Sequence, residues 1–172
     1  SLLHDDVIDE ANIRRGKPSI NALFGSKNSV MLGDILYSKA YFELTKFDPS
    51  IAAVISDAVS KLSIGEMMDV KMAENFNENE QEYLKMIYYK TAVLIEATAI
   101  CGAKLAGKDS EKFGLYGKNL GLAFQIVDDI LDITQDEKTL GKPALNDFVE
   151  GKTTLPYIYL YKSLDGANQT KL

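Results

Sequence analysis

The sequence predicts an all-α protein, one bundle of long helices, from three observations. Apolar residues recur at intervals of three and four along most of the 172 residues, which is the period of a helix that buries one face. No segment alternates apolar and polar residues convincingly over the length of a strand. Short polar segments separate the apolar stretches, and none suggests a linker to a second domain. We therefore expect a single domain over residues 1–172.

The expected helices follow one another with short connections. The segment 5–9 reads as helix and is followed by a loop over 10–19. Apolar periodicity predicts further helices over 30–47, 49–74, 79–105, 110–134 and 154–164. Pro49 suits a first helical turn, Asn79 with Glu82 suits an N-terminal cap, and Gly107 is placed to end the helix before it. A polar connection over 136–152 precedes the last helix.

Composition narrows the possible functions. The chain is 46% hydrophobic and 26% charged, which is typical of a globular domain with a sizeable core. Its net charge of −6, from 25 acidic and 19 basic residues, argues against a nucleic-acid partner. No stretch reaches transmembrane length and no secretory signal is present, so we expect a cytoplasmic protein without stable membrane insertion. Cys101 lies in an apolar run and reads as a buried, inert thiol.

Both ends of the sequence suggest a fragment of a longer protein. Ser1 leads into the first acidic segment within four residues, without an initiator Met or a helix cap. The residues 165–172 are polar and provide no closing apolar element. We expect helices to be missing at the N-terminal end and at the C-terminal end.

The pattern Asp-Asp-x-x-Asp occurs twice, as the first motif (Asp5, Asp6, Asp9) and the second motif (Asp128, Asp129, Asp132). On a helix, the first and last aspartates of each motif lie one turn apart on one face. Like charges at this spacing repel by about 0.2–0.5 kcal/mol per pair, so local stability disfavours both motifs. If the motifs face each other, six carboxylates meet and need cations to neutralise them. Oxygen ligands shared with phosphates favour Mg2+ over Ca2+.

Basic and polar residues near these motifs complete the candidate site. Gln125, Asp128 and Asp132 follow one another at i, i+3 and i+7, a polar stripe on an otherwise apolar helix. Arginine and lysine side chains suited to a polyphosphate occur in loops or in apolar surroundings, at Arg14, Arg15, Lys90, Lys142 and Lys152. Carboxylates together with these cations indicate a metal-bridged diphosphate.

These residues resemble the trans-isoprenyl diphosphate synthase family. Five motifs occur in the family's order along almost the whole chain, and a single Asp-Asp-x-x-Asp would be weak evidence by itself. They are the first motif with Arg14-Arg15-Gly16, Lys90-Thr91, Phe124-Gln125 with the second motif, Gly141-Lys142, and Gly151-Lys152 with Thr153-Thr154-Leu155-Pro156. The family's upstream Gly-Lys-Arg group, which contacts isopentenyl diphosphate, is absent from this chain.

The resemblance implies helices around a central cavity, a homodimer, and head-to-tail condensation of an allylic diphosphate with isopentenyl diphosphate. It implies three Mg2+ ions bridged by the substrate diphosphate. Asp5, Asp9 and Asp128 would bind Mg2+ directly, and Asp6, Asp129 and Asp132 would be further ligands or hold bound water. Arg14, Lys90 and Lys142 would contact the allylic diphosphate with support from Lys152, and Arg15 would face isopentenyl diphosphate. Thr91, Gln125 and Phe124 would stabilise the carbocation.

Three alternatives compete with a chain-elongating synthase of long products. A terpene cyclase would usually replace the second motif by an Asn/Asp-x-x-x-Ser/Thr-x-x-x-Glu pattern, which is absent at 128–132. A non-catalytic subunit of a heteromeric synthase would typically lose the first motif or its arginines, and both are present. A synthase of shorter C15 or C20 products is the third alternative.

Product length depends on Ser1 in this interpretation. In the family, bulky aromatics four and five residues before the first aspartate form the floor of the product tunnel. Ser1 stands four residues before Asp5 and is small, so it favours a deep tunnel with its floor among the helices 30–47 and 49–74. We expect a C40 product that supplies a quinone side chain.

Overall fold

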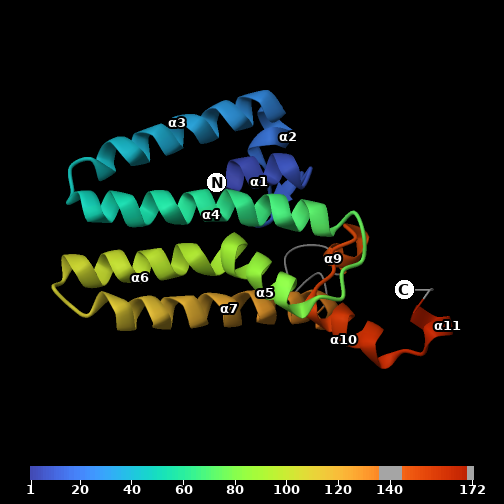
Figure 1. Ribbon diagram of the computed structural model, residues 1–172. Coiled ribbons are helices and arrows are strands. Elements are labelled where there is room, and N and C mark those ends of the chain that lie inside the picture. Colours follow the sequence, from blue (N-terminus) through green and yellow to red (C-terminus); the bar gives the residue numbers. More distant parts are fainter. Residues whose placement is uncertain (136–144, 170–172) are drawn as a thin grey trace. The chain divides into compact units, whose positions relative to one another are not determined.

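The computed structural model describes residues 1–135 and 145–169, and the chain falls into two compact units. The first unit contains residues 1–52, and the second contains 53–135 with 145–169. The long elements are helices throughout, which confirms the predicted all-α class (Figure 1). None of the described helices is long and apolar enough to cross a membrane. The single domain over 1–172 stays a prediction.

The first unit carries the first aspartate motif. It consists of α1 (Leu2–Ile8), a hairpin of β1 (Ile13–Arg14) and β2 (Lys17–Pro18), α2 (Ile20–Phe24), α3 (Ser26–Leu44) and the first turn of α4 (Pro49–Met72). The loop predicted over 10–19 is wrong in part, because it contains this hairpin. Arg15 and Gly16 have φ values of 52° and 73°, which suit the two-residue turn that joins twisted antiparallel strands.

Small residues bring α1 close to α3. The Ser29 hydroxyl donates to the carbonyl oxygen of Leu3 at 3.0 Å. Gly33 faces the His4 ring, and a Cβ atom there would lie 2.5 Å from His4 Nε2. One turn further along α3, Tyr37 stacks on His4 with ring centroids 5.6 Å apart. The position of α1, and thus of the first motif, is therefore set by one face of α3.

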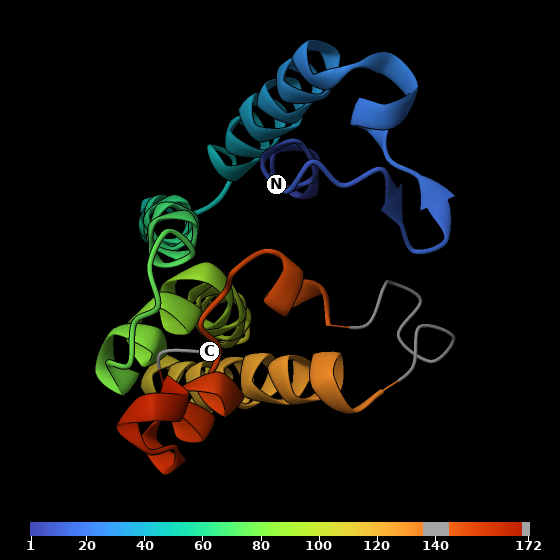
Figure 2. The ribbon, with the colours of Figure 1, turned by 90° about the vertical axis from the view of Figure 1, so that its right-hand side faces the viewer.

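The second unit contains the rest of α4, α5 (Glu80–Ile87), a π-helical turn (Tyr88–Ala92), α6 (Val93–Leu105), α7 (Ser110–Thr134) and the shorter α9 (Asn146–Val149), α10 (Leu155–Ser163) and α11 (Gly166–Gln169). The helices α6 and α7 form a hairpin and lie side by side in Figures 1 and 2. One part of the core is formed by Tyr83, Met86, Ile87 and Ile158. This core joins α5 and α10 and packs against Leu122 and Ile126 of α7, which precede the second aspartate motif.

The helix ends agree largely with the predicted ones. Pro49 begins α4. The Asn79 side chain caps α5 by accepting from the backbone N–H groups of Gln81 and Glu82. The Glu82 carboxylate accepts from Asn77 Nδ2 at 2.5 Å.

The helix predicted to run without interruption to Leu105 contains a π turn at Tyr88–Ala92. Two glycines on other helices approach its backbone closely. A Cβ atom on Gly65 of α4 would collide with the backbone nitrogen of Lys90, and one on Gly121 of α7 would lie 2.5 Å from Ala92 Cα. Neighbouring helices can come this close only where no side chain intervenes. The π turn is therefore packed between two helices at the positions that carry Lys90 and Thr91.

We predict that Gly121→Ala destabilises the protein by about 1–3 kcal/mol, because the new methyl group overpacks against Ala92. Gly102→Ala is the matched control on α6, where a Cβ atom would meet nothing within 4 Å. That change should stabilise the protein by up to about 1 kcal/mol through helix propensity. Urea unfolding of the two variants measures both effects, and equal midpoints would contradict the close packing at Gly121.

Candidate active site

The first motif separates its aspartates by environment. Asp6 is buried and accepts from Arg14 Nε at 2.6 Å. Asp5 and Asp9 are partly exposed and lie one helical turn apart, since the Asp9 N–H donates to the Asp5 carbonyl oxygen at 2.8 Å. The hairpin returns Arg14 to Asp6 and leaves Arg15 exposed at its turn. Asp5 and Asp9 are thus the better placed of the three for an external cation.

Side chains of the next segment fix the end of α1. Asn21 Nδ2 donates to the carbonyl oxygens of Asp6 and Ala11, at 3.2 and 3.0 Å. The Ser19 hydroxyl donates to the carbonyl oxygen of Ala11 at 2.7 Å. The Asp6 carbonyl oxygen also accepts from the Ala11 N–H at 2.9 Å. Together these bonds fasten the segment after the hairpin to the end of α1.

The second motif shows the same division. Asp129 is buried at 4% exposure, and its two carboxylate oxygens accept from Tyr83 OH at 2.7 Å and from Gln125 Nε2 at 2.8 Å. Asp132 is fully buried and accepts from the backbone N–H of Asp147 at 3.1 Å. Asp128 is partly exposed. Asp128 is therefore the member of this motif best placed to meet a ligand.

Burial and hydrogen bonds also affect protonation in this region. Burial raises the pKa of Asp129, and the hydrogen bonds from Tyr83 and Gln125 offset only part of that rise. Burial and the Asp129 carboxylate raise the pKa of Tyr83 well above its ordinary value. Tyr83 is therefore a neutral donor to Asp129.

The π turn brings Thr91 to Gln125. The Thr91 hydroxyl donates to Gln125 Oε1 at 2.7 Å, which joins the two residues predicted to stabilise a cation. Phe124, predicted to offer a ring face nearby, is 59% exposed on α7. Lys142 lies outside the described residues.

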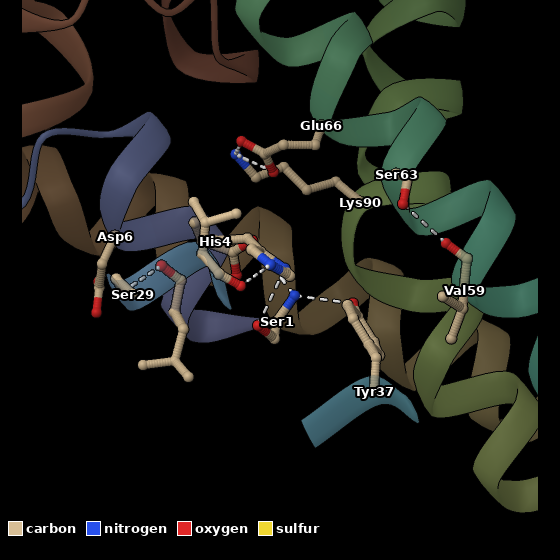
Figure 3. Close-up of polar contacts among 12 residues, drawn as sticks. Ser1, His4, Asp6, Ser29, Tyr37, Val59, Ser63, Glu66 and Lys90 are labelled. Atoms are coloured by element: carbon tan, nitrogen blue, oxygen red, sulfur yellow. Dashed lines mark hydrogen bonds and ion pairs between the residues drawn. The ribbon is translucent and has the colours of Figure 1, made fainter. Parts of the chain in front are cut away.

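Lys90 is held by two acidic residues that the sequence analysis did not identify. Its Nζ atom pairs with Asp69 and lies 3.2 Å from Glu66 Oε2, as Figure 3 shows for Glu66. Burial lowers the pKa of Lys90, but Asp69 and Glu66 outweigh this and leave the pKa raised. Lys152 joins the same group, 3.8 Å from Asp69 and 2.5 Å from Glu150. The feature of the sequence that could have identified the two acidic residues is their spacing, Glu66-x-x-Asp69, within an apolar stretch of α4.

Ser1 lies at the N-terminal end of α1, against α3. Its nitrogen donates to Tyr37 OH at 2.8 Å, and its hydroxyl lies 3.2 Å from His4 Nδ1 (Figure 3). Tyr37, which stacks on His4, places an aromatic ring at the end of α1 that carries Ser1, the residue predicted to control product length.

Each unit gathers part of the predicted site. Arg14 and the first motif lie in the first unit, whereas Lys90, Thr91, Gln125, Lys152 and the second motif lie in the second. Among the described residues of either unit, no three histidine, cysteine or carboxylate side chains converge closely enough to hold a metal ion. The predicted convergence of six aspartates draws on both units and stays a prediction.

Comparison with known proteins gives consistent matches along the chain. A family model described as polyprenyl synthetase matches residues 1–172. A short chain isoprenyl diphosphate synthase from Methanothermobacter thermautotrophicus is 39% identical over 98% of this chain and 54% of its own length. The crystal structure of octaprenyl pyrophosphate synthase from Helicobacter pylori matches with a TM-score of 0.94 at 55% identity, over 99% of this chain and 56% of that one.

A polyprenyl synthase from Caulobacter crescentus, solved in complex with calcium and isoprenyl diphosphate, matches with a TM-score of 0.91 at 37% identity. The match covers 99% of this chain and 53% of that one. The chain thus spans about half the length of the relatives and structures that it matches.

We predict that Lys90→Met destabilises the protein by about 3–5 kcal/mol, because it removes the ammonium group that pairs with the buried Glu66 and the nearer of the two that pair with the buried Asp69. Adding Asp69→Asn should restore part of this loss. Lys61→Met is the matched control, since Lys61 pairs with the exposed Asp57 and should contribute less than about 1 kcal/mol. Urea unfolding distinguishes the two lysines, and equal losses would contradict a buried role for Lys90.

Proposed function

Because the chain belongs to the polyprenyl synthetase family, we propose that the full-length protein condenses an allylic diphosphate with isopentenyl diphosphate to a trans-polyprenyl diphosphate. The observation that carries this proposal is the paired Asp-Asp-x-x-Asp pattern, in a chain that the family model matches throughout. The first motif lies at the end of α1, with Asp9 as its C-cap, and the second lies within α7. The binding of both diphosphates and assembly as a homodimer belong to the same proposal. A cytoplasmic location stays a prediction, since the names of related proteins include chloroplastic and mitochondrial ones.

The residues present fit a hard divalent cation. Asp5, Asp9 and Asp128 are the partly exposed carboxylates of the two motifs, and carboxylate oxygens suit Mg2+. We assign direct metal binding to these three and a supporting role to the buried Asp6 and Asp132. Bound with a substrate diphosphate, Mg2+ would neutralise the negative charge of the leaving group.

The chain's own side chains would bind and orient the substrates. Lys90 and Lys152, each already placed by carboxylates, would present ammonium groups to the allylic diphosphate, and Arg15 would bind isopentenyl diphosphate. Lys142 and Arg14 would add further positive charge. Thr91 and Gln125 would direct oxygen dipoles toward the carbon that loses the diphosphate, with the ring face of Phe124 nearby. The departed diphosphate would accept the proton that is lost after the new C–C bond forms.

We further propose a long product, with C40 and a quinone side chain as the best estimate, on the basis of the small Ser1. The proteins that this chain resembles include both short-chain and octaprenyl synthases. One observation favours the short-chain alternative of C15 or C20. Tyr37 stacks on His4 and so brings from α3, to the end of α1 that carries Ser1, the aromatic bulk that Ser1 itself lacks.

We predict that Asp128→Ala or Asp5→Ala in the full-length protein lowers turnover by more than about 100-fold. Loss of a direct metal ligand should lower turnover more than loss of a residue that only supports a ligand. The melting temperature should be unchanged or slightly raised, because each change also removes charge repulsion. Asp57→Ala on the exposed face of α4 is the control and should retain activity. Retained turnover in both motif variants, or a loss explained by unfolding, would overturn the proposed function.

The product-length proposal has its own test, which uses farnesyl diphosphate as the primer and mass spectrometry of the products. We expect chains near C40 from the unmodified enzyme and shorter chains after Ser1→Phe. If the unmodified enzyme stops at C15 or C20 and Tyr37→Ala lengthens the product, Tyr37 is the floor and the proposal for Ser1 is wrong. A long product that Ser1→Phe leaves unchanged also contradicts it.

A further inference from the structure

Each of the two carboxylate oxygens of Asp129 accepts a hydrogen bond from a side chain. Tyr83, on α5, is fully buried, so its hydroxyl cannot hydrogen-bond to bulk water. The hydroxyl donates to Asp129 Oδ2 instead. The other carboxylate oxygen, Oδ1, accepts from Gln125 one turn earlier on α7. Asp129 thus uses both oxygens within the protein.

This arrangement fixes the orientation of the Gln125 amide. An amide has a donor end and an acceptor end, and its orientation follows from its neighbours. Asp129, accepting on both oxygens, requires the Nε2 end, so that Oε1 must face Thr91. The Thr91 hydroxyl then donates to Oε1. The lone pairs of the Thr91 hydroxyl oxygen can then face a group other than Gln125 and Asp129.

We propose that Asp129 and Tyr83 are positioning residues, which orient Gln125 and Thr91 for the reaction, and that Asp129 is not a metal ligand. This inference rests on the proposed function, in which Thr91 and Gln125 face the developing cation. It assigns a role to Tyr83, which no motif of the sequence contains. It also separates Asp129 from its neighbour Asp128 in the same motif.

The direction of the hydrogen bonds gives this arrangement an electrostatic effect. Donation runs from Thr91 to Gln125 and from Gln125 to Asp129, so the carboxylate charge polarises both bonds in the same sense. The Thr91 oxygen becomes more negative than an isolated hydroxyl. A cation forming beside it would be stabilised, whereas a reversed amide would present an N–H group to Thr91 and lose this effect.

The test compares Asp129→Asn and Tyr83→Phe with Asp128→Asn in the full-length protein. Asp129→Asn keeps the shape but removes the charge, and should lower kcat by about 10- to 100-fold, with KM for both diphosphates within about twofold. Tyr83→Phe removes one hydrogen bond and should lower kcat by about three- to tenfold. Glu111→Gln, an exposed carboxylate on α7, is the matched control and should leave kcat unchanged.

Calorimetry of Mg2+ in the presence of pyrophosphate separates positioning from metal binding. We expect Asp129→Asn to bind Mg2+ within about twofold of the unmodified protein, and Asp128→Asn to bind it at least about tenfold more weakly. Equal weakening in the two variants would make Asp129 a ligand and overturn the proposal. An unchanged kcat in Asp129→Asn would overturn it as well.

A third readout requires no turnover. With 15N-labelled glutamine, the Gln125 side-chain amide should exchange its hydrogens with solvent at least about tenfold faster in Asp129→Ala than in the unmodified protein, because its acceptor is lost. Unchanged exchange would overturn the positioning role even if the variant were inactive. Absence of any condensation by the unmodified enzyme would contradict the proposed function alone, since exchange and calorimetry still decide the role of Asp129.

Discussion

Buried carboxylates constrain how the segments of this protein pack, because each needs donors once water is removed. A carboxylate buried without partners costs several kcal/mol. Asp6 therefore requires the arginine that the hairpin returns to α1, and Asp129 requires Tyr83 and Gln125. Asp132 requires the backbone of the segment that follows residue 145. In each motif, this pairing divides the aspartates held by the protein from those that remain partly exposed.

The π turn in the second unit also brings side chains to buried polar groups that need partners. Lys90 and Thr91 are neighbours in sequence, yet one contacts carboxylates of α4 and the other contacts Gln125 of α7. The close approach of Gly65 and Gly121 holds the backbone of this turn between the two helices. π turns are uncommon and occur frequently at functional sites. Here the turn allows two adjacent side chains to serve two different helices.

Local signals explain which features the sequence could predict. The helices, the Asn79 cap and the one-turn spacing of Asp5 and Asp9 depend on residues within a few positions, and these predictions hold. The π turn depends on glycines far away in sequence, so periodicity alone read it as uninterrupted helix. Glu66 was missed for a related reason: an acidic residue on a helix usually faces water, and only the position of Lys90 shows that this one does not.

Product length cannot be predicted from a single residue such as Ser1. Ser29, Gly33 and Tyr37 recur every four residues on α3 and form the face that contacts α1. The two small residues let α1 approach closely near the first motif, and the aromatic residue then fills the space at the other end, beside Ser1. A small side chain at Ser1 opens space only if its partner on α3 is also small or can move. Our proposal for product length therefore involves both Ser1 and Tyr37, whereas a rule based on distance from the first aspartate considers Ser1 alone.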